Sequence, residues 1–90
     1  MTPSRWSYIT GTATDGVIAG PGTSLRGVAV NATAAATCTL YNAATTSDTS
    51  DPVAVIDLTD ARSRDFWGIR LDAGLVAIVT ADCDITVAWG

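Results

Sequence analysis

A chain of 90 residues with a formal net charge of -4 and a sequence pI of about 4.2 can build one domain around one hydrophobic core. The acidic balance excludes a basic nucleic-acid binder, because such binding depends on Lys and Arg side chains that neutralise phosphates. Every base is Arg, every acid is Asp, and Glu, Lys, Gln and His are absent, so the usual helix-forming surface residues are missing. Composition therefore predicts turns and strands rather than helices.

The first third of the chain contains short apolar segments separated by glycine-rich turns. Alternating side chains predict strands at residues 6–10 and 25–32, and a short strand around residues 17–19. The Gly-Pro-Gly sequence at residues 20–22 predicts a turn between them.

The middle of the chain alternates strands with polar connections. Residues 37–41 and 53–58 are predicted strands, because apolar and polar side chains alternate in both. Between them, residues 42–52 have no apolar periodicity and are expected to form an exposed, mobile loop. Residues 59–65 are a second polar connection, in which we expect one helical turn.

Three further strands are predicted at residues 66–71, 75–80 and 83–89. The joints between them, residues 72–74 and 81–82, are short. Since tight connections usually join antiparallel neighbours, these strands are expected to form an antiparallel meander.

The fold class predicted by these segments is all-β, an antiparallel β-sandwich or small barrel of about seven or eight short strands. Residues 1–16 are interpreted as an N-terminal arm or first strand, and residues 17–90 as a single sandwich domain. A domain of this size buries only roughly 60–65% of its unfolded surface, so a partner subunit would add needed stability. Oligomerisation is expected.

Two cysteines, Cys38 and Cys83, each fall within an alternating apolar pattern. Two thiols without a histidine are too few to hold zinc, so neither a metal nor a cofactor is expected. Two interpretations stay open: a pair of buried free thiols, which we favour, and a disulfide between Cys38 and Cys83.

No motif in the chain indicates catalysis. The absence of histidine excludes Ser-His-Asp and Cys-His arrangements, and Asp82 with Asp84, the closest acid pair, is interpreted as a solvated turn. No apolar run approaches the roughly 20 residues that cross a bilayer, and residues 1–6 lack the apolar core of a signal peptide. We expect a non-enzymatic protein that is made in a cytoplasm and does not act in a membrane.

The aromatic side chains are the main interface candidates. Alternation places Phe66 and Trp67 on opposite faces of one strand, so one of them should point outward. Exposed Trp is typical of binding hot spots, which makes Trp6 and Trp67 candidates for contact with a partner.

Four segments together resemble the small all-β head decoration, or cement, proteins of tailed bacteriophages. They are LRGVAVN at residues 25–31, TLYN at 39–42, GIRLDAGL at 68–75 and ADCDITV at 81–87. The resemblance covers roughly residues 17–89 as a pattern of strands and turns.

This resemblance implies a β-sandwich virion protein outside the major capsid protein lattice, commonly a homotrimer at local three-fold positions. It implies a location on the capsid exterior after synthesis in the host cytoplasm. The implied partner is the major capsid protein, and the implied action is capsid stabilisation. We expect the contacts to come from the N-terminal segment and exposed aromatics, with Arg5, Trp6, Tyr8 and Trp67 as the candidate partner-binding residues.

The alternative function is another phage β-sandwich interaction module, such as a tail or head fibre or a carbohydrate-binding domain. A carbohydrate site would require aromatic side chains on one face beside Asp or Asn. Tyr41 with Asn42 is a pair of this kind, and by itself it is too small a set of residues to form such a site.

Overall fold

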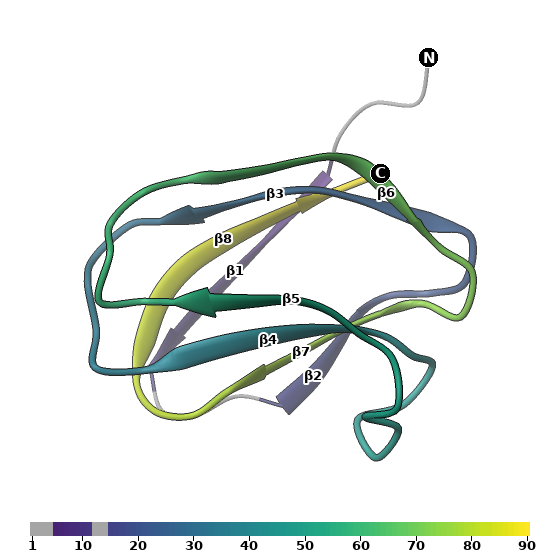
Figure 1. The fold of residues 1–90 in the computed structure, drawn as a ribbon, viewed down its shortest axis with the longest axis horizontal. Coiled ribbons are helices and arrows are strands. Elements are labelled where there is room, and N and C mark those ends of the chain that lie inside the picture. Colours follow the sequence, from purple (N-terminus) through teal and green to yellow (C-terminus); the bar gives the residue numbers. More distant parts are fainter. Residues whose placement is uncertain (1–4, 12–14) are drawn as a thin grey trace.

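The computed structural model describes residues 5–11 and 15–90, which form eight strands and no helix in two antiparallel sheets (Figure 1). The all-β prediction is confirmed, and of its two alternatives the chain forms the sandwich. The strands are β1 Arg5–Gly11, β2 Asp15–Ala19, β3 Thr23–Val30, β4 Thr37–Asn42, β5 Pro52–Asp57, β6 Arg64–Leu71, β7 Leu75–Val79 and β8 Cys83–Trp89.

One sheet, called sheet A here, has the strand order β1-β8-β3-β6, and the other, sheet B, has the order β2-β7-β4-β5. Sheet A therefore has β1 and β6 at its edges, and sheet B has β2 and β5. Among the strands of the described residues, β4 and β5 are the one consecutive pair that forms a hairpin, and its loop projects from the lower right of Figure 1.

The predicted meander of the last three strands is wrong. Strand β6 pairs with β3, β7 pairs with β2 and β4, and β8 pairs with β1 and β3, so each short joint crosses between the sheets. Leu71 and Leu75 flank the first joint, and both are fully buried. Each points into the core from its own sheet, so their burial favours a chain that passes from sheet A to sheet B at this joint. Gly74 within it has φ 140°, and a Cβ there would lie 2.6 Å from the carbonyl oxygen of Ala43.

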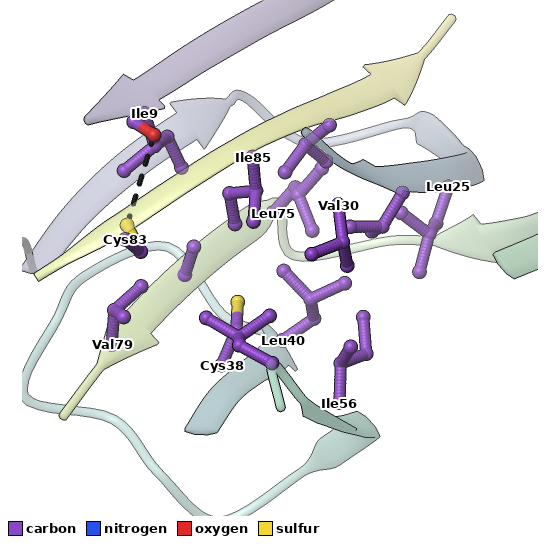
Figure 2. Packing of buried hydrophobic residues seen from close by; sticks show 14 of the residues in the cluster. Ile9, Leu25, Val30, Cys38, Leu40, Ile56, Leu75, Val79, Cys83 and Ile85 are labelled. Atoms are coloured by element: carbon purple, nitrogen blue, oxygen red, sulfur yellow. Dashed lines mark hydrogen bonds between the residues drawn. The ribbon is translucent and has the colours of Figure 1, made fainter. Parts of the chain in front are cut away.

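The core lies between the sheets and is built by the inward half of each alternating strand (Figure 2). Strand β4 contributes Cys38 and Leu40, and β8 contributes Ile85 and Val87, all with no exposed surface. Each large aliphatic side chain buried in this way stabilises the fold by about 1.5–3 kcal/mol. This packing holds β8 at the centre of sheet A, where it carries β1 on one side and β3 on the other.

Cys38 and Cys83 are both free, buried thiols, which confirms the favoured prediction. They come from opposite sheets, and the Cys83 Sγ donates to the carbonyl oxygen of Ile9 at 3.7 Å (Figure 2). Burial, reinforced by the neighbouring Cys83, raises the pKa of the Cys38 thiol to about 12. Both residues therefore act as small apolar core side chains at neutral pH.

The polar connections follow the predictions in part. Residues 44–51 are exposed, and Asp48 and Asp51 organise that loop by accepting hydrogen bonds from Ser50 and Asn42. Residues 59–63 contain no helical turn, because Asp57 instead accepts hydrogen bonds from the backbone and side chain of Thr59. Polar side chains here close local turns that compete with a helix.

Candidate functional site

Within the described part of the chain, the exposed large apolar side chains all lie on the four edge strands of the sandwich. Trp6 and Tyr8 lie on β1, and Trp67 lies on β6, the opposite edge of the same sheet. Sheet B carries Val17 on β2 and Val55 on β5, and Ile69 on β6 completes the set. Exposed Trp and Tyr are the side chains most often found in binding hot spots, which directs attention to sheet A.

The outer face of sheet A contains an open hollow of about 510 Å³. Its floor consists of small side chains, because Ala29 on β3 and Thr86 and Ala88 on β8 are the outward members of strands whose alternate residues fill the core. The register aligns Ala88 with Trp6 on one side and with Gly27 on the other. The hollow forms because a row of small residues lies beside a large aromatic side chain.

The rim of the hollow combines an aromatic side with a charged side. Trp6, which is 70% exposed, borders it on β1, and Arg26, Arg64 and Asp65 border it on β3 and β6. The Arg64 guanidinium is occupied by hydrogen bonds that it donates to the backbone carbonyl oxygens of Arg62 and Asp57. The hollow therefore offers an apolar floor, an indole ring and the charged residues Arg26 and Asp65 to one ligand surface, which support binding through contact area and hydrogen bonds.

A polar network lies on the same face, next to Tyr8. The Asn31 side-chain amide donates to Asp84 Oδ1 at 3.3 Å and to the Thr86 hydroxyl at 3.1 Å. Hydrogen bonding with Asp84 raises the pKa of Tyr8, and desolvation and the negative charge of Asp84 act in the same direction. Tyr8 is therefore a neutral phenol beside a carboxylate and an amide in the physiological range.

Arg5 lies apart from this face. It shares the inward side of β1 with Ser7 and Ile9, and its guanidinium lies 5.7 Å from the centre of the Trp89 ring. The Trp89 indole N–H donates to the Ser7 hydroxyl at 3.3 Å. Arg5 thus covers one end of the sandwich and does not join Trp6 and Tyr8.

Trp67 is presented by an irregular segment of β6. The β3–β6 register shifts between Leu25 and Gly27, so the segment around Trp67 has no regular partners on β3. Trp67 has φ 56° and Gly68 has φ 79°, a pair of left-handed residues of the kind found in type I′ turns. The Asp65 side chain accepts a hydrogen bond from the Trp67 backbone N–H at 2.9 Å, and the indole is 89% exposed.

The structure brings together two of the four candidate partner-binding residues. Trp6 and Tyr8 share the outward side of β1. Trp67 lies on β6, and two strands stand between β1 and β6, so three strand spacings, roughly 14 Å, separate these two edges. The prediction that one of Phe66 and Trp67 points outward is confirmed, since Phe66 packs against the core.

Sequence reasoning missed the hollow. The alternation of β3 and β8 already places Ala29, Thr86 and Ala88 outward, but their neighbours depend on strand order. Arg26 and Arg64 are far apart in the chain and meet at the hollow only because β3 pairs with β6.

Among residues 5–11 and 15–90, no group of three or more Cys, Asp, Glu or His side chains is placed to hold a metal ion. The same residues include no helix of the length and apolarity that crossing a membrane requires. In comparisons with protein-family models, curated proteins and solved structures, the chain has no match. The geometry of sheet A is therefore the basis for assigning a function.

Proposed function

We propose that the chain is a non-enzymatic virion structural protein that decorates and stabilises a bacteriophage capsid by binding the outer surface of the major capsid protein lattice. The observation that carries this proposal is the outer face of sheet A, where the exposed Trp6 and Tyr8 stand beside an open hollow. An apolar floor with an aromatic and charged rim suits contact with another protein surface. The resemblance of residues 17–89 to head decoration proteins supplies the identity of that surface.

The physical mechanism is selective binding to one form of the shell. A decoration protein that binds only the expanded lattice stabilises it by mass action, since unexpanded subunits do not offer the same surface. Each contact can be modest, because the copies repeat with the symmetry of the shell and a joined oligomer binds several sites at once. The homotrimer that the resemblance implies would gain affinity in this way.

The experiment is cosedimentation of the purified chain with expanded and unexpanded heads of tailed phages. Replacing Trp6 and Tyr8 together by Ser should lower occupancy on expanded heads at least about tenfold, because truncating hot-spot aromatics typically costs 2 kcal/mol or more. These substitutions leave the core untouched, since both side chains are exposed. Removing residues 1–8 would be a poor test, because β1 begins at Arg5 and pairs with β8.

The matched control is Val55→Ser, which changes an exposed apolar side chain on the edge of sheet B. Its occupancy should equal that of the wild type. Equal loss in the control, or full occupancy of the double variant, would place the contact elsewhere and contradict the proposal. Binding to unexpanded heads with the same affinity would remove the stabilising mechanism.

A second function, carbohydrate binding within a tail or head fibre, is favoured by one observation. Tyr8 lies beside Asp84 and Asn31 on the same face as Trp6, which is the combination of aromatic and polar side chains that a sugar site requires. Tyr41 and Asn42 are not needed for it. Calorimetric titration with host cell-wall glycans would test this function, with Tyr8→Ala expected to abolish any heat of binding.

A further inference from the structure

The four edge strands of the sandwich differ in regularity. Strand β1 pairs with β8 in an unbroken register over all seven of its residues. The other three edges are interrupted: β2 between Val17 and Ala19, β6 opposite Arg26, and β5 beside Pro52. Bulges and proline are the features by which proteins prevent an edge from pairing with another chain, and β1 has neither.

The edges also differ in charge. Strands β2 and β5 each contain one aspartate and no base, whereas β1 contains Arg5 alone and β6 contains Asp65 with Arg64 and Arg70. In a chain of net charge -4, an acidic edge is one where a second copy meets repulsion, which disfavours β2 and β5. The interrupted register disfavours β6, so β1 is the edge that both properties leave open.

We propose that β1 is a strand-addition edge that pairs with β1 of a second copy of this chain, antiparallel and with Tyr8 on the two-fold axis. Centring the pair on Tyr8 aligns all seven residues of both strands. The two β1 strands then join two copies of sheet A into one continuous sheet with the order β6-β3-β8-β1-β1-β8-β3-β6. Such a contact is isologous, so it closes after two copies.

The side chains of β1 are compatible with this register. On the outward side, Tyr8 faces Tyr8 of the second copy, and Trp6 faces Thr10. The first is a pair of aromatic residues and the second combines an aromatic with a β-branched residue, and both kinds of cross-strand pair stabilise sheets. On the inward side, Arg5 faces Gly11, so no like charges lie opposite each other. Beside this edge, Ile9 and Val17 line a smaller hollow of about 210 Å³ between the sheets, which the second copy would shield from water.

The contact does not depend on capsid binding, and it is distinct from the three-fold association that the resemblance implies. It can join two single chains or two trimers. Failure on capsids would leave it intact, and a chain that decorates capsids without pairing through β1 would overturn it alone.

The decisive experiment is disulfide trapping with matched cysteine variants of the full chain. In Tyr8→Cys, the two new thiols lie directly opposite each other, within the Cα separation of about 4.4–6.8 Å that a disulfide needs. In Thr10→Cys, on the same face and also exposed, the thiols lie roughly 13 Å apart along the strands. With diamide as oxidant, Tyr8→Cys should give at least about tenfold more crosslinked dimer on a non-reducing gel.

The wild type should give no crosslink because Cys38 and Cys83 are buried. Equal crosslinking of Tyr8→Cys and Thr10→Cys, or none in either, would overturn the proposal. Circular dichroism of each variant shows that the sandwich is retained, as expected for side chains at exposed positions.

A charge-swap experiment tests the two-fold axis independently. Tyr8→Lys and Tyr8→Glu should each be monomeric by light scattering, because like charges then face each other across the axis. An equimolar mixture should recover the dimer, since Lys then faces Glu. Val55→Lys, on the edge of sheet B, should associate like the wild type. If the separate variants associate normally, or the mixture stays monomeric, Tyr8 is not on the axis.

Discussion

The two edges of sheet A present aromatic side chains to solvent in opposite ways. Strand β1 does so by regular alternation, in which Trp6 and Tyr8 point outward while Ile9 enters the core. Strand β6 does so from an irregular segment, with Trp67 and Gly68 in left-handed conformations and the register to β3 shifted. Exposure at β1 costs the backbone nothing, whereas exposure at β6 requires strain.

This difference shows that exposed aromatic residues have unequal meaning for function. A regular edge strand exposes every second side chain, whatever the residue type, so the exposure of Trp6 follows from the fold. A bulky residue held at φ 56° is a true conformational outlier that costs roughly 1–3 kcal/mol, and the surrounding structure must impose it. Asp65 contributes to that by binding the Trp67 N–H.

The largest effect should come from removing the residue that anchors β1 to the core. Ile9→Ala should lower the free energy of unfolding by about 2–5 kcal/mol, because it removes buried methylene groups and leaves a cavity. Urea denaturation measures this loss, and Val17→Ala on the exposed edge of sheet B is the control, with a change within about 0.5 kcal/mol. In hydrogen exchange, protection should fall more in β1 than in β6. Equal loss in both edges would mean that the two are not independent units.

A smaller loss is expected at the glycine of the β6 bulge. Gly68→Ala should destabilise the chain by about 1–2 kcal/mol, since a Cβ is unfavourable at φ 79° although the space around it is open. Thermal unfolding measures the change. An unchanged melting temperature would show that β6 does not hold the left-handed conformation in solution.

The same substitution, Trp to Asn, should change the free energy of unfolding in opposite directions at the two edges. Trp67→Asn should raise the free energy of unfolding by about 1 kcal/mol, because Asn tolerates the left-handed conformation and Asn-Gly is the favoured pair in type I′ turns. Trp6→Asn should lower it by a similar or smaller amount, because Asn is disfavoured in a regular strand. Paired urea titrations measure both. A gain at both positions would indicate that exposure of the indole, and not backbone strain, sets the stability.

The slightest effect is a difference in thiol reactivity. Cys83 lies behind β1 and bonds to the Ile9 carbonyl, so opening of that edge exposes it, whereas Cys38 in sheet B requires wider unfolding. With a disulfide reagent at pH 8, Cys83 should be labelled before Cys38, as peptide mass spectrometry can measure. Burial raises the pKa of Cys83 as well, so both reactions should be slow. Simultaneous labelling would mean that β1 opens only with the whole domain.

The thiol of Cys38 also predicts how stability depends on pH. Its folded pKa of about 12 lies above its ordinary value of 9.0, so the folded state holds the proton more tightly than the unfolded state. This contribution to stability is complete below pH 9 and should be lost as the pH rises from about 9 toward 12. Urea midpoints measured across this range should fall, and a rising midpoint would contradict the assignment of Cys38 to the core.

The amino-acid sequence by itself determined the strands and which side chains each one buries. Alternation at Cys38 and Leu40, or at Ile85 and Val87, is a local property, because successive side chains of a strand point to opposite faces. It also predicted that Trp67 or Phe66 would be exposed. For the same reason, the strand positions in the structure agree with the predicted ones to within a few residues.

The strand order, the hollow and the β6 bulge were decided only by the tertiary structure. The short joint at residues 72–74 is compatible with a hairpin or with a crossing between sheets, and burial of Leu71 and Leu75 against both sheets selects the crossing. Arg26 and Arg64 meet at the hollow through that order alone. Local periodicity states which face of a strand is apolar, whereas the choice of neighbour depends on packing among segments far apart in the chain.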